Sequence, residues 1–435
     1  MPRPPDFRVF RRWNAAAVRL LMIRQAHHER GRSACPERAI PAHAEQASSA
    51  HPELVEGRAD ETPQGHAFPS PAAHADLLLA ALLAVAFTAL AAALLFLLPR
   101  PAIKYDAVEY QLLAESLARG DGFRLRPDDF PTAYRPPLYP ALLALAFLLF
   151  GASVDVAYGL QAALHGLTVG VVYLLGREFL ARRFALGAAV LTGLSVGLTC
   201  LVGFLMTETL QTLLVAAGAL ALVRWERGWS WHWAAAAGLL WGLALLAKGT
   251  NAALLGLWLA ALLALRWRAW RRWALGVALL GGVLVLTLLP WTVRNTLRFG
   301  QPALVSTNIG IQVYVATLDP LTFDRSDPRM MRVVNEARAL GLNEAATDRL
   351  FLRYGLERLA ADPWTHLARA ARNALRLWEL PPRDALEYLK PTVMYNDLPE
   401  YRALVWLHYL TLALALAGLA LAWRRRETTL LALWT

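Results

Sequence analysis

Long apolar runs separated by short clusters of charge make up most of the chain after residue 76. The run 77–98 contains no charged residue, and its length matches the roughly 20 apolar residues that a helix needs to cross a bilayer core. The pattern is typical of an all-α polytopic membrane protein. We predict about eight spanning helices of this kind, at residues 77–98, 155–176, 184–205, 208–223, 233–250, 251–265, 273–291 and 403–423.

One further apolar run is too short to span the bilayer comfortably. It covers residues 137–150, and a run of this length is more typical of an interfacial or re-entrant helix. Counting it as a full span would invert the predicted side of every later loop. We therefore predict an interfacial helix here, next to the first outer loop.

Arginine collects in short segments between the apolar runs, which indicates the cytoplasmic side of the membrane. The predicted cytoplasmic segments are the N-terminal tail, Arg177 with Arg182 and Arg183, Arg224 with Arg227, residues 266–272, and Arg424 to Arg426. Residues 99–137, the turns near 206–208 and 248–251, and residues 292–402 then fall on the outer side. We expect any chemistry in these outer segments.

The same pattern divides the chain into four parts. Residues 1–76 are rich in Arg, His, Pro, Ala and Ser, which favours a disordered cytoplasmic tail. Residues 77–291 form the transmembrane core with residues 99–137 as its first outer loop, and residues 292–402 form a periplasmic cap. Residues 403–435 hold the last span and what we expect to be a truncated C-terminus. Weak helical periodicity predicts a small helical cap, with helices at 329–340 and 344–377 and breaks at Pro320, Pro328, Pro363 and Pro381–Pro382.

Composition supports a membrane protein and argues against other classes. The 435 residues are 57% hydrophobic and 18% charged, too apolar for an ordinary soluble chain. The net charge is +11, but the arginines lie between apolar runs rather than along one face with interleaved aromatics, so we predict no nucleic-acid partner. Cys35 and Cys200 lie in a polar tail and an apolar run, which supports neither a disulfide framework nor a thiolate metal site.

An acidic pair opens the first outer loop. Asp106 and Glu109 stand three residues apart at the start of an amphipathic segment that Gly120 would close. They fit a capping box, in which Asp106 caps the helix and Glu109 bonds back to the backbone. They also fit a general base held at the membrane surface by an interfacial helix. The two interpretations are compatible.

A proline-rich segment with a single cation follows. Residues 131–140 contain four prolines and Arg135, with Tyr134 and Tyr139 on either side, so we predict a stiff interfacial segment. Arg135 is either a headgroup anchor or the cation that holds a phosphate.

Isolated charges mark the outer ends of later apolar runs. Glu208 and Lys248 lie there, and charges in such places are costly unless they snorkel, pair or serve a function. Because both fall on the same side as Asp106, we predict a shared polar cavity. Arg294 and Arg298 break the rule that arginine stays inside, although snorkelling would account for one of them.

These residues together resemble the GT-C superfamily of membrane glycosyltransferases, in the branch with protein O-mannosyltransferases and the lipid A aminoarabinose transferase. The resemblance covers residues 77–301 well and 292–402 loosely. It rests on four motifs: Asp106-x-x-x-Tyr110 with Leu117-Ala-x-Gly120, Arg135-Pro-Pro-Leu-Tyr-Pro140, Thr207-Glu208, and Pro290-Trp-x-x-Arg294-Asn.

The resemblance implies a bacterial inner-membrane enzyme with a periplasmic active site. It would transfer a sugar from a polyprenyl-phosphate carrier to a lipid, glycan or protein acceptor, with inversion at the anomeric carbon. Neither a cofactor nor a metal is required. The implied catalytic residues are Asp106, Glu109 and Glu208, and the implied substrate-binding residues are Tyr110, Tyr134, Arg135, Lys248 and Arg294.

A transporter or flippase is the alternative from another class. Glu208 and Lys248 would then form a coupling pair within the membrane. The large outer cap and the absence of an inverted repeat in the sequence favour the enzyme.

Overall fold

The computed structural model describes residues 71–97, 103, 106–228, 230–265, 270–319 and 326–376, together with a few positions between 409 and 420. The predicted tail up to residue 70, most of the predicted last span at 403–423, and Arg424 to Arg426 lie outside the described residues. The chain divides into two units, 1–75 and 76–435. The helices below lie in the second unit, apart from the first residues of α2.

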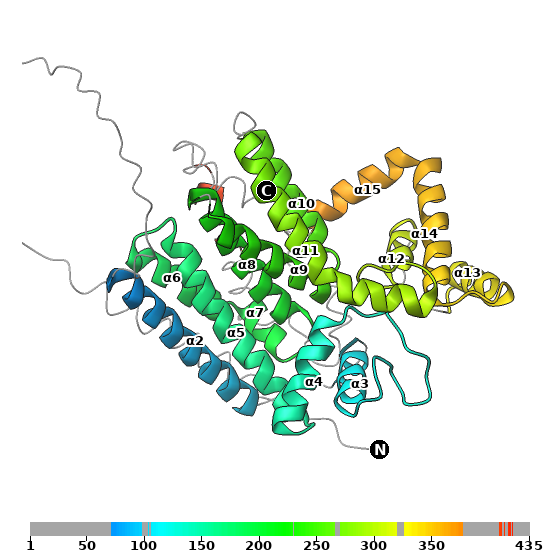
Figure 1. Cartoon of the computed structure of the whole chain (residues 1–435), viewed down its shortest axis with the longest axis horizontal. Helices are drawn as coiled ribbons and strands as arrows, with labels where there is room; N and C mark the ends of the chain where they lie inside the picture. The colour runs from blue at the N-terminus through cyan, green and yellow to red at the C-terminus, as the bar shows by residue number, and fades with distance from the viewer. Residues whose placement is uncertain are drawn as a thin grey trace, which may run out of the picture. The chain divides into compact units, whose positions relative to one another are not determined.

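The described residues are mainly helical (Figure 1). The helices that precede the cap are α2 (Pro71–Leu97), α3 (Asp106–Ala118), α4 (Leu138–Phe150), α5 (Val154–Arg177), α6 (Arg182–Gly193), α7 (Val196–Val202), α8 (Glu208–Gly228), α9 (Trp231–Ala247), α10 (Asn251–Leu265) and α11 (Trp270–Phe299). The cap contains α12 (Ile309–Ala316), α13 (Pro328–Ala339), α14 (Glu344–Ala361) and α15 (Pro363–Arg376).

Apolar helices confirm the all-α polytopic membrane fold. Within the described residues, α2, α5 and α11 contain segments long and apolar enough to cross a membrane, and α4, α9 and α10 are shorter apolar helices. The number of spans, and the interfacial position of residues 137–150, stay predictions. Residues 138–150 of this run do form a separate short helix, α4, which packs against α3 and α5.

Three predicted boundaries were wrong. Residues 71–76 are helical, because α2 begins at Pro71 instead of at residue 77. The predicted span 184–205 is divided between two helices, α6 and α7, with residues 194–195 and 203–205 outside both. The Gly193 carbonyl at the break accepts a hydrogen bond from Thr199 Oγ1 at 3.3 Å. The last core helix does not end at residue 291, since α11 continues through Pro290 to Phe299. Proline is tolerated inside membrane helices when neighbouring groups bond the freed backbone.

Small residues allow the core helices to pack closely, as is common between membrane helices. A Cβ atom on Gly166 of α5 would lie 2.2 Å from the Ala84 carbonyl oxygen of α2. A Cβ atom on Gly238 of α9 would lie 2.4 Å from the Leu280 carbonyl oxygen of α11. These two glycines therefore set how closely α2 approaches α5 and how closely α9 approaches α11.

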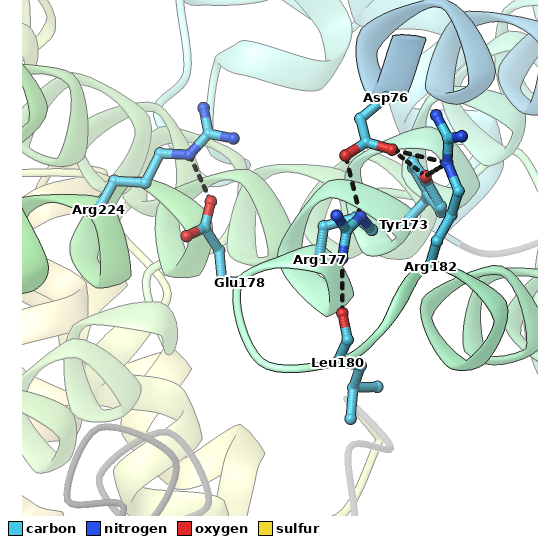
Figure 2. Close-up of polar contacts among 7 residues, drawn as sticks. All are labelled: Asp76, Tyr173, Arg177, Glu178, Leu180, Arg182 and Arg224. Atoms are coloured by element: carbon cyan, nitrogen blue, oxygen red, sulfur yellow. Dashed lines mark hydrogen bonds and ion pairs between the residues drawn. The ribbon is translucent and has the colours of Figure 1, made fainter. Parts of the chain in front are cut away.

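Acidic residues join the predicted cytoplasmic arginine clusters at one end of the bundle (Figure 2). Asp76 accepts hydrogen bonds from Arg177 Nε at 2.9 Å and Arg182 Nε at 3.0 Å. Glu178 accepts a bond from Arg224 Nε at 2.7 Å. The predicted clusters at Arg177 and Arg224 therefore lie at the same end of the helices, as a shared membrane side requires.

The cap packs around its own apolar centre, which includes Tyr314, Met330 and Phe351. Helices α13 and α15 begin at the predicted breaks Pro328 and Pro363, because proline is favoured in the first turn of a helix. The sequence analysis missed α12. A carboxylate of α14 secures that short helix, since Asp348 Oδ1 accepts a hydrogen bond from Ile311 N at 3.1 Å.

Candidate active site

Helix α3 presents the predicted acidic pair. Ala107, Tyr110, Leu113 and Ala114 form its buried face, and the helix gives way to a turn at Gly120, whose φ of 83° favours glycine. Asp106 and Glu109 lie in the first turn, where the helix dipole stabilises negative charge.

Arg135 binds both carboxylates at once. Its Nη1 and Nη2 donate to the two oxygens of Asp106 at 2.9 and 2.6 Å, and its Nε donates to Glu109 Oε2 at 2.6 Å. The Arg135 side chain is 14% exposed, whereas Asp106 is 42% and Glu109 26% exposed. Burial disfavours the Arg135 charge, but the two carboxylates hold its pKa above the ordinary value.

This geometry bears on both interpretations made from the sequence. The hydrogen bonds found for the Asp106 and Glu109 side chains are to Arg135, rather than to the backbone of α3 as a capping box requires. Arg135 is not a simple headgroup anchor, because its guanidinium faces the acidic pair. A carboxylate with both oxygens engaged still has lone pairs to accept a proton.

Tyrosines surround the guanidinium. The guanidinium carbon of Arg135 lies 5.1 Å from the centre of the Tyr134 ring and 5.6 Å from the centre of the Tyr110 ring. Both distances are within range of a cation–π contact. Tyr110 is 5% exposed and meets Tyr139 edge to face at 5.4 Å. Burial raises the pKa of Tyr110 to about 12, against the opposing effect of Arg135. Tyr110 therefore supports Arg135 from the protein interior.

Glu208 and Lys248 form the second polar pair, with Lys248 Nζ 3.0 Å from Glu208 Oε1. Glu208 is the first residue of α8, and Lys248 directly follows α9. The charges of Glu208 and Asp106 both raise the pKa of Tyr110, so both pairs lie near that ring. Asp106, Glu208 and Lys248 thus lie in one neighbourhood, while the predicted polar cavity shared by them stays a prediction.

Arg294 lines a cavity near the end of α11. Its Nη1 donates to two neutral oxygens, Thr132 O and Asn295 Oδ1, each at 2.9 Å, and its guanidinium carbon lies 4.8 Å from the centre of the Trp291 ring. The cavity has a volume of about 580 Å³, and Arg298, Phe123 and Pro131 also line it. Two cations therefore face one open space.

Sequence reasoning missed two of these features. Arg298 broke the sidedness rule but was not assigned to a site, and its helical spacing from Arg294 places both on one face of α11. Glu344 had no recognisable motif; its carboxylate contacts Thr132 and Ala133 of the first outer loop. Among the described residues, no group of three or more His, Cys, Asp or Glu is placed to hold a metal ion.

Known proteins resemble part of this arrangement. The family model described as dolichyl-phosphate-mannose-protein mannosyltransferase matches residues 134–293. The match contains Arg135, Glu208 and Lys248; it stops one residue before Arg294 and leaves out the acidic pair of α3. Over this part of the chain, the match and the polytopic all-α fold support the predicted class, a membrane glycosyltransferase of the GT-C superfamily.

Two solved structures are similar to the chain at low identity. Both are ArnT from Cupriavidus metallidurans, one bound to undecaprenyl phosphate and one in the apo state. They are 19% and 20% identical to this chain, with TM-scores of 0.44 and 0.41, and each alignment covers 83% of this chain and 75% of ArnT. At these TM-scores the superposition is loose, so the class rests on the family model and the helices. No curated protein matches the chain significantly.

Proposed function

We propose that the chain is an inverting glycosyltransferase that moves a sugar from a polyprenyl-phosphate carrier to a lipid, glycan or protein acceptor. The active site would face the periplasm from the bacterial inner membrane. The observation that carries the proposal is the half-exposed Asp106 carboxylate, which Arg135 holds in one orientation through two hydrogen bonds. The description of the matched family, a transferase that uses a polyprenyl-phosphate sugar, supports the donor class.

In the proposed reaction, Asp106 accepts the proton of an acceptor hydroxyl as that oxygen attacks the anomeric carbon. The bond from that carbon to the phosphate oxygen breaks, and the carrier phosphate leaves with its electron pair. Glu109 is held beside Asp106 through Arg135, and Glu208 is held by Lys248. These contacts fix the carboxylates before the substrates arrive, which lowers the cost of reaching the reactive geometry.

The cavity lined by Arg294 and Arg298 is the favoured place for the carrier phosphate. Arg135 and Lys248 already face carboxylates at 3.0 Å or less, which weakens their attraction for a second anion. Arg294 contacts neutral oxygens, and arginine can bind phosphate oxygens in a bidentate manner.

Asp106→Asn tests the proposal. The amide keeps the size of the side chain and one acceptor oxygen, but it does not act as a base at neutral pH. We expect a deletion strain that carries this variant to accumulate the same lipid-linked sugar as the deletion strain alone, with the protein inserted at normal levels. Asp121→Asn is the matched control, since Asp121 lies in the same loop and pairs with Arg119 at 2.9 Å. A normal lipid profile with Asp106→Asn would overturn the proposal.

The Glu208–Lys248 pair keeps a transporter or flippase as the second candidate. The pair forms as that alternative requires, but it lies at the N-terminus of α8 and just after α9, with 27% and 39% of the side chains exposed. A coupling pair at the bilayer midplane would be more deeply buried, so this position favours the enzyme. Transport of the carrier lipid that survives Asp106→Asn in vesicles would favour the transporter.

A further inference from the structure

The segment 131–135, called the strap here, carries Arg135 from the end of the first outer loop to the carboxylates of α3. Thr132 and Ala133 are buried, and backbone groups hold them on two sides. Thr132 N donates to Phe123 O at 3.0 Å, and Thr307 N donates to Ala133 O at 2.9 Å. The position of Arg135 therefore depends on contacts made two and three residues before it.

Glu344 of the cap contacts the strap through both oxygens of its side chain. Its Oε2 accepts a hydrogen bond from Thr132 Oγ1 at 2.7 Å, and its Oε1 accepts one from Ala133 N at 2.8 Å. Oε1 also accepts a bond from Thr307 Oγ1. One carboxylate thus joins the first outer loop, the segment after α11, and the cap.

The local structure favours a carboxylate at this point. Glu344 is the first residue of α14, where the positive end of the helix dipole stabilises negative charge. Asn343 caps the helix by accepting a hydrogen bond from Ala346 N at 2.9 Å, so Glu344 is not needed as the cap. Ala345, the next residue, packs in an apolar cluster with Ala133 and Phe299.

We propose that Glu344 is a positioning residue: by fixing the strap, the cap sets the orientation of Arg135 and through it the reactive carboxylate Asp106. The proposal rests on the proposed transferase function. In this arrangement the cap does not touch the reacting atoms. It acts through the two residues that precede Tyr134 and Arg135.

A purely structural role makes a different forecast. If Glu344 only attached the cap, its loss would lower the amount of folded protein without changing turnover per folded molecule. If Glu344 positions Arg135, its loss lowers kcat in protein that remains folded, because small displacements of catalytic groups reduce rates strongly. KM for the carrier lipid should change less than kcat, because Arg294 keeps its bond to Asn295 Oδ1 within α11, although its bond to Thr132 O involves the strap.

The test compares Glu344→Ala and Glu344→Gln with Glu336→Ala as the matched control. Glu336 is another cap carboxylate, and it accepts a hydrogen bond from Tyr354 OH at 2.7 Å without contacting the strap. For Glu344→Ala we expect kcat to fall by about tenfold or more, KM to change by less than about threefold, and amide hydrogen exchange to accelerate in peptides that contain Ala133. Glutamine can still accept from Ala133 N, so Glu344→Gln should retain most of kcat.

The outcomes separate this inference from the proposed function. Faster exchange in the strap with an unchanged kcat would overturn the positioning role and leave the transferase intact. The same kcat loss in Glu336→Ala would overturn it as well, because any damage to the cap would then suffice. Normal transfer by Asp106→Asn would instead remove the proposed function, whatever Glu344 does.

Discussion

Replacing Arg135 by Gln should destabilise the folded protein, because it removes the cation that faces both Asp106 and Glu109. Three hydrogen bonds of 2.6 to 2.9 Å are lost, and a bond to a charged group contributes about 1.5–3 kcal/mol. Their sum is too large an estimate, since 42% of the Asp106 side chain is exposed and solvent screens it. We expect the free energy of unfolding to fall by about 3 kcal/mol, the lower end for breaking a buried pair.

Two further variants divide that loss into charge and geometry. Arg135→Lys keeps the charge but gives up the bidentate contact, so the loss should be about 1–2 kcal/mol. The double variant with Gln at positions 135 and 109 removes one of the two unpaired carboxylates. It should be more stable than Arg135→Gln by about 1 kcal/mol, since neighbouring charges do not contribute additively.

Thermal unfolding of the purified protein in lipid nanodiscs measures these differences. Arg119→Gln is the control, because its pair with Asp121 leaves 50% of the arginine side chain exposed and such pairs contribute less than about 1 kcal/mol. The reasoning is refuted if Arg135→Gln is no more destabilising than Arg119→Gln. It is also refuted if the double variant with Gln at positions 135 and 109 is less stable than Arg135→Gln.

Three other predictions follow from the same structure. The double variant Arg294→Gln and Arg298→Gln should weaken binding of polyprenyl phosphate in vesicles by about tenfold or more, whereas a carrier site elsewhere would leave binding unchanged. Burial raises the pKa of Asp348. The protonated side chain therefore stabilises the fold fully below the ordinary carboxyl pKa, and this stabilisation is lost as the pH rises through the raised pKa. At neutral pH the Asp348→Asn variant should be more stable than the native protein, and the difference in stability should disappear as the pH is lowered. In a variant whose two native cysteines have been replaced, a thiol reagent outside intact spheroplasts should label Arg126→Cys but not Trp270→Cys. Equal labelling of the two positions would contradict the predicted topology.

Much of the fold was predictable because apolar runs report membrane helices directly. The break within 184–205 was not, since no proline marks it and the run stays apolar. At the break, the Gly193 carbonyl contacts another helix, because His165 Nε2 of α5 lies 3.2 Å from it, and the carbonyl also accepts the local bond from Thr199 Oγ1. The extension of α11 past Pro290 was missed for a related reason: a proline read in isolation indicates a helix end, whereas a packed membrane helix tolerates it.

The candidate site likewise contains contacts that the sequence predicts and contacts that it does not. Asp106 and Glu109 are three residues apart, and helical spacing alone places them on one face. That Arg135, 26 residues after Glu109, binds both of them depends on the path of the strap. Glu344 lies 212 residues from Thr132, and no local pattern reports a contact between segments so far apart. The sequence therefore revealed charged residues next to apolar runs, and it did not reveal a residue such as Glu344, whose role depends on a contact between distant segments.

Negative and positive charges lie in separate parts of the candidate site. Asp106, Glu109 and Arg135 together leave one net negative charge at the start of α3, where the proposed reaction needs a base. Arg294 and Arg298 bring two positive charges to the cavity, where a phosphate would be held. The strap connects the two, because the Thr132 carbonyl binds Arg294 and Arg135 follows three residues later. An inverting transfer needs the base and the leaving phosphate on different sides of the sugar, and a short, buried segment between them would keep that separation fixed.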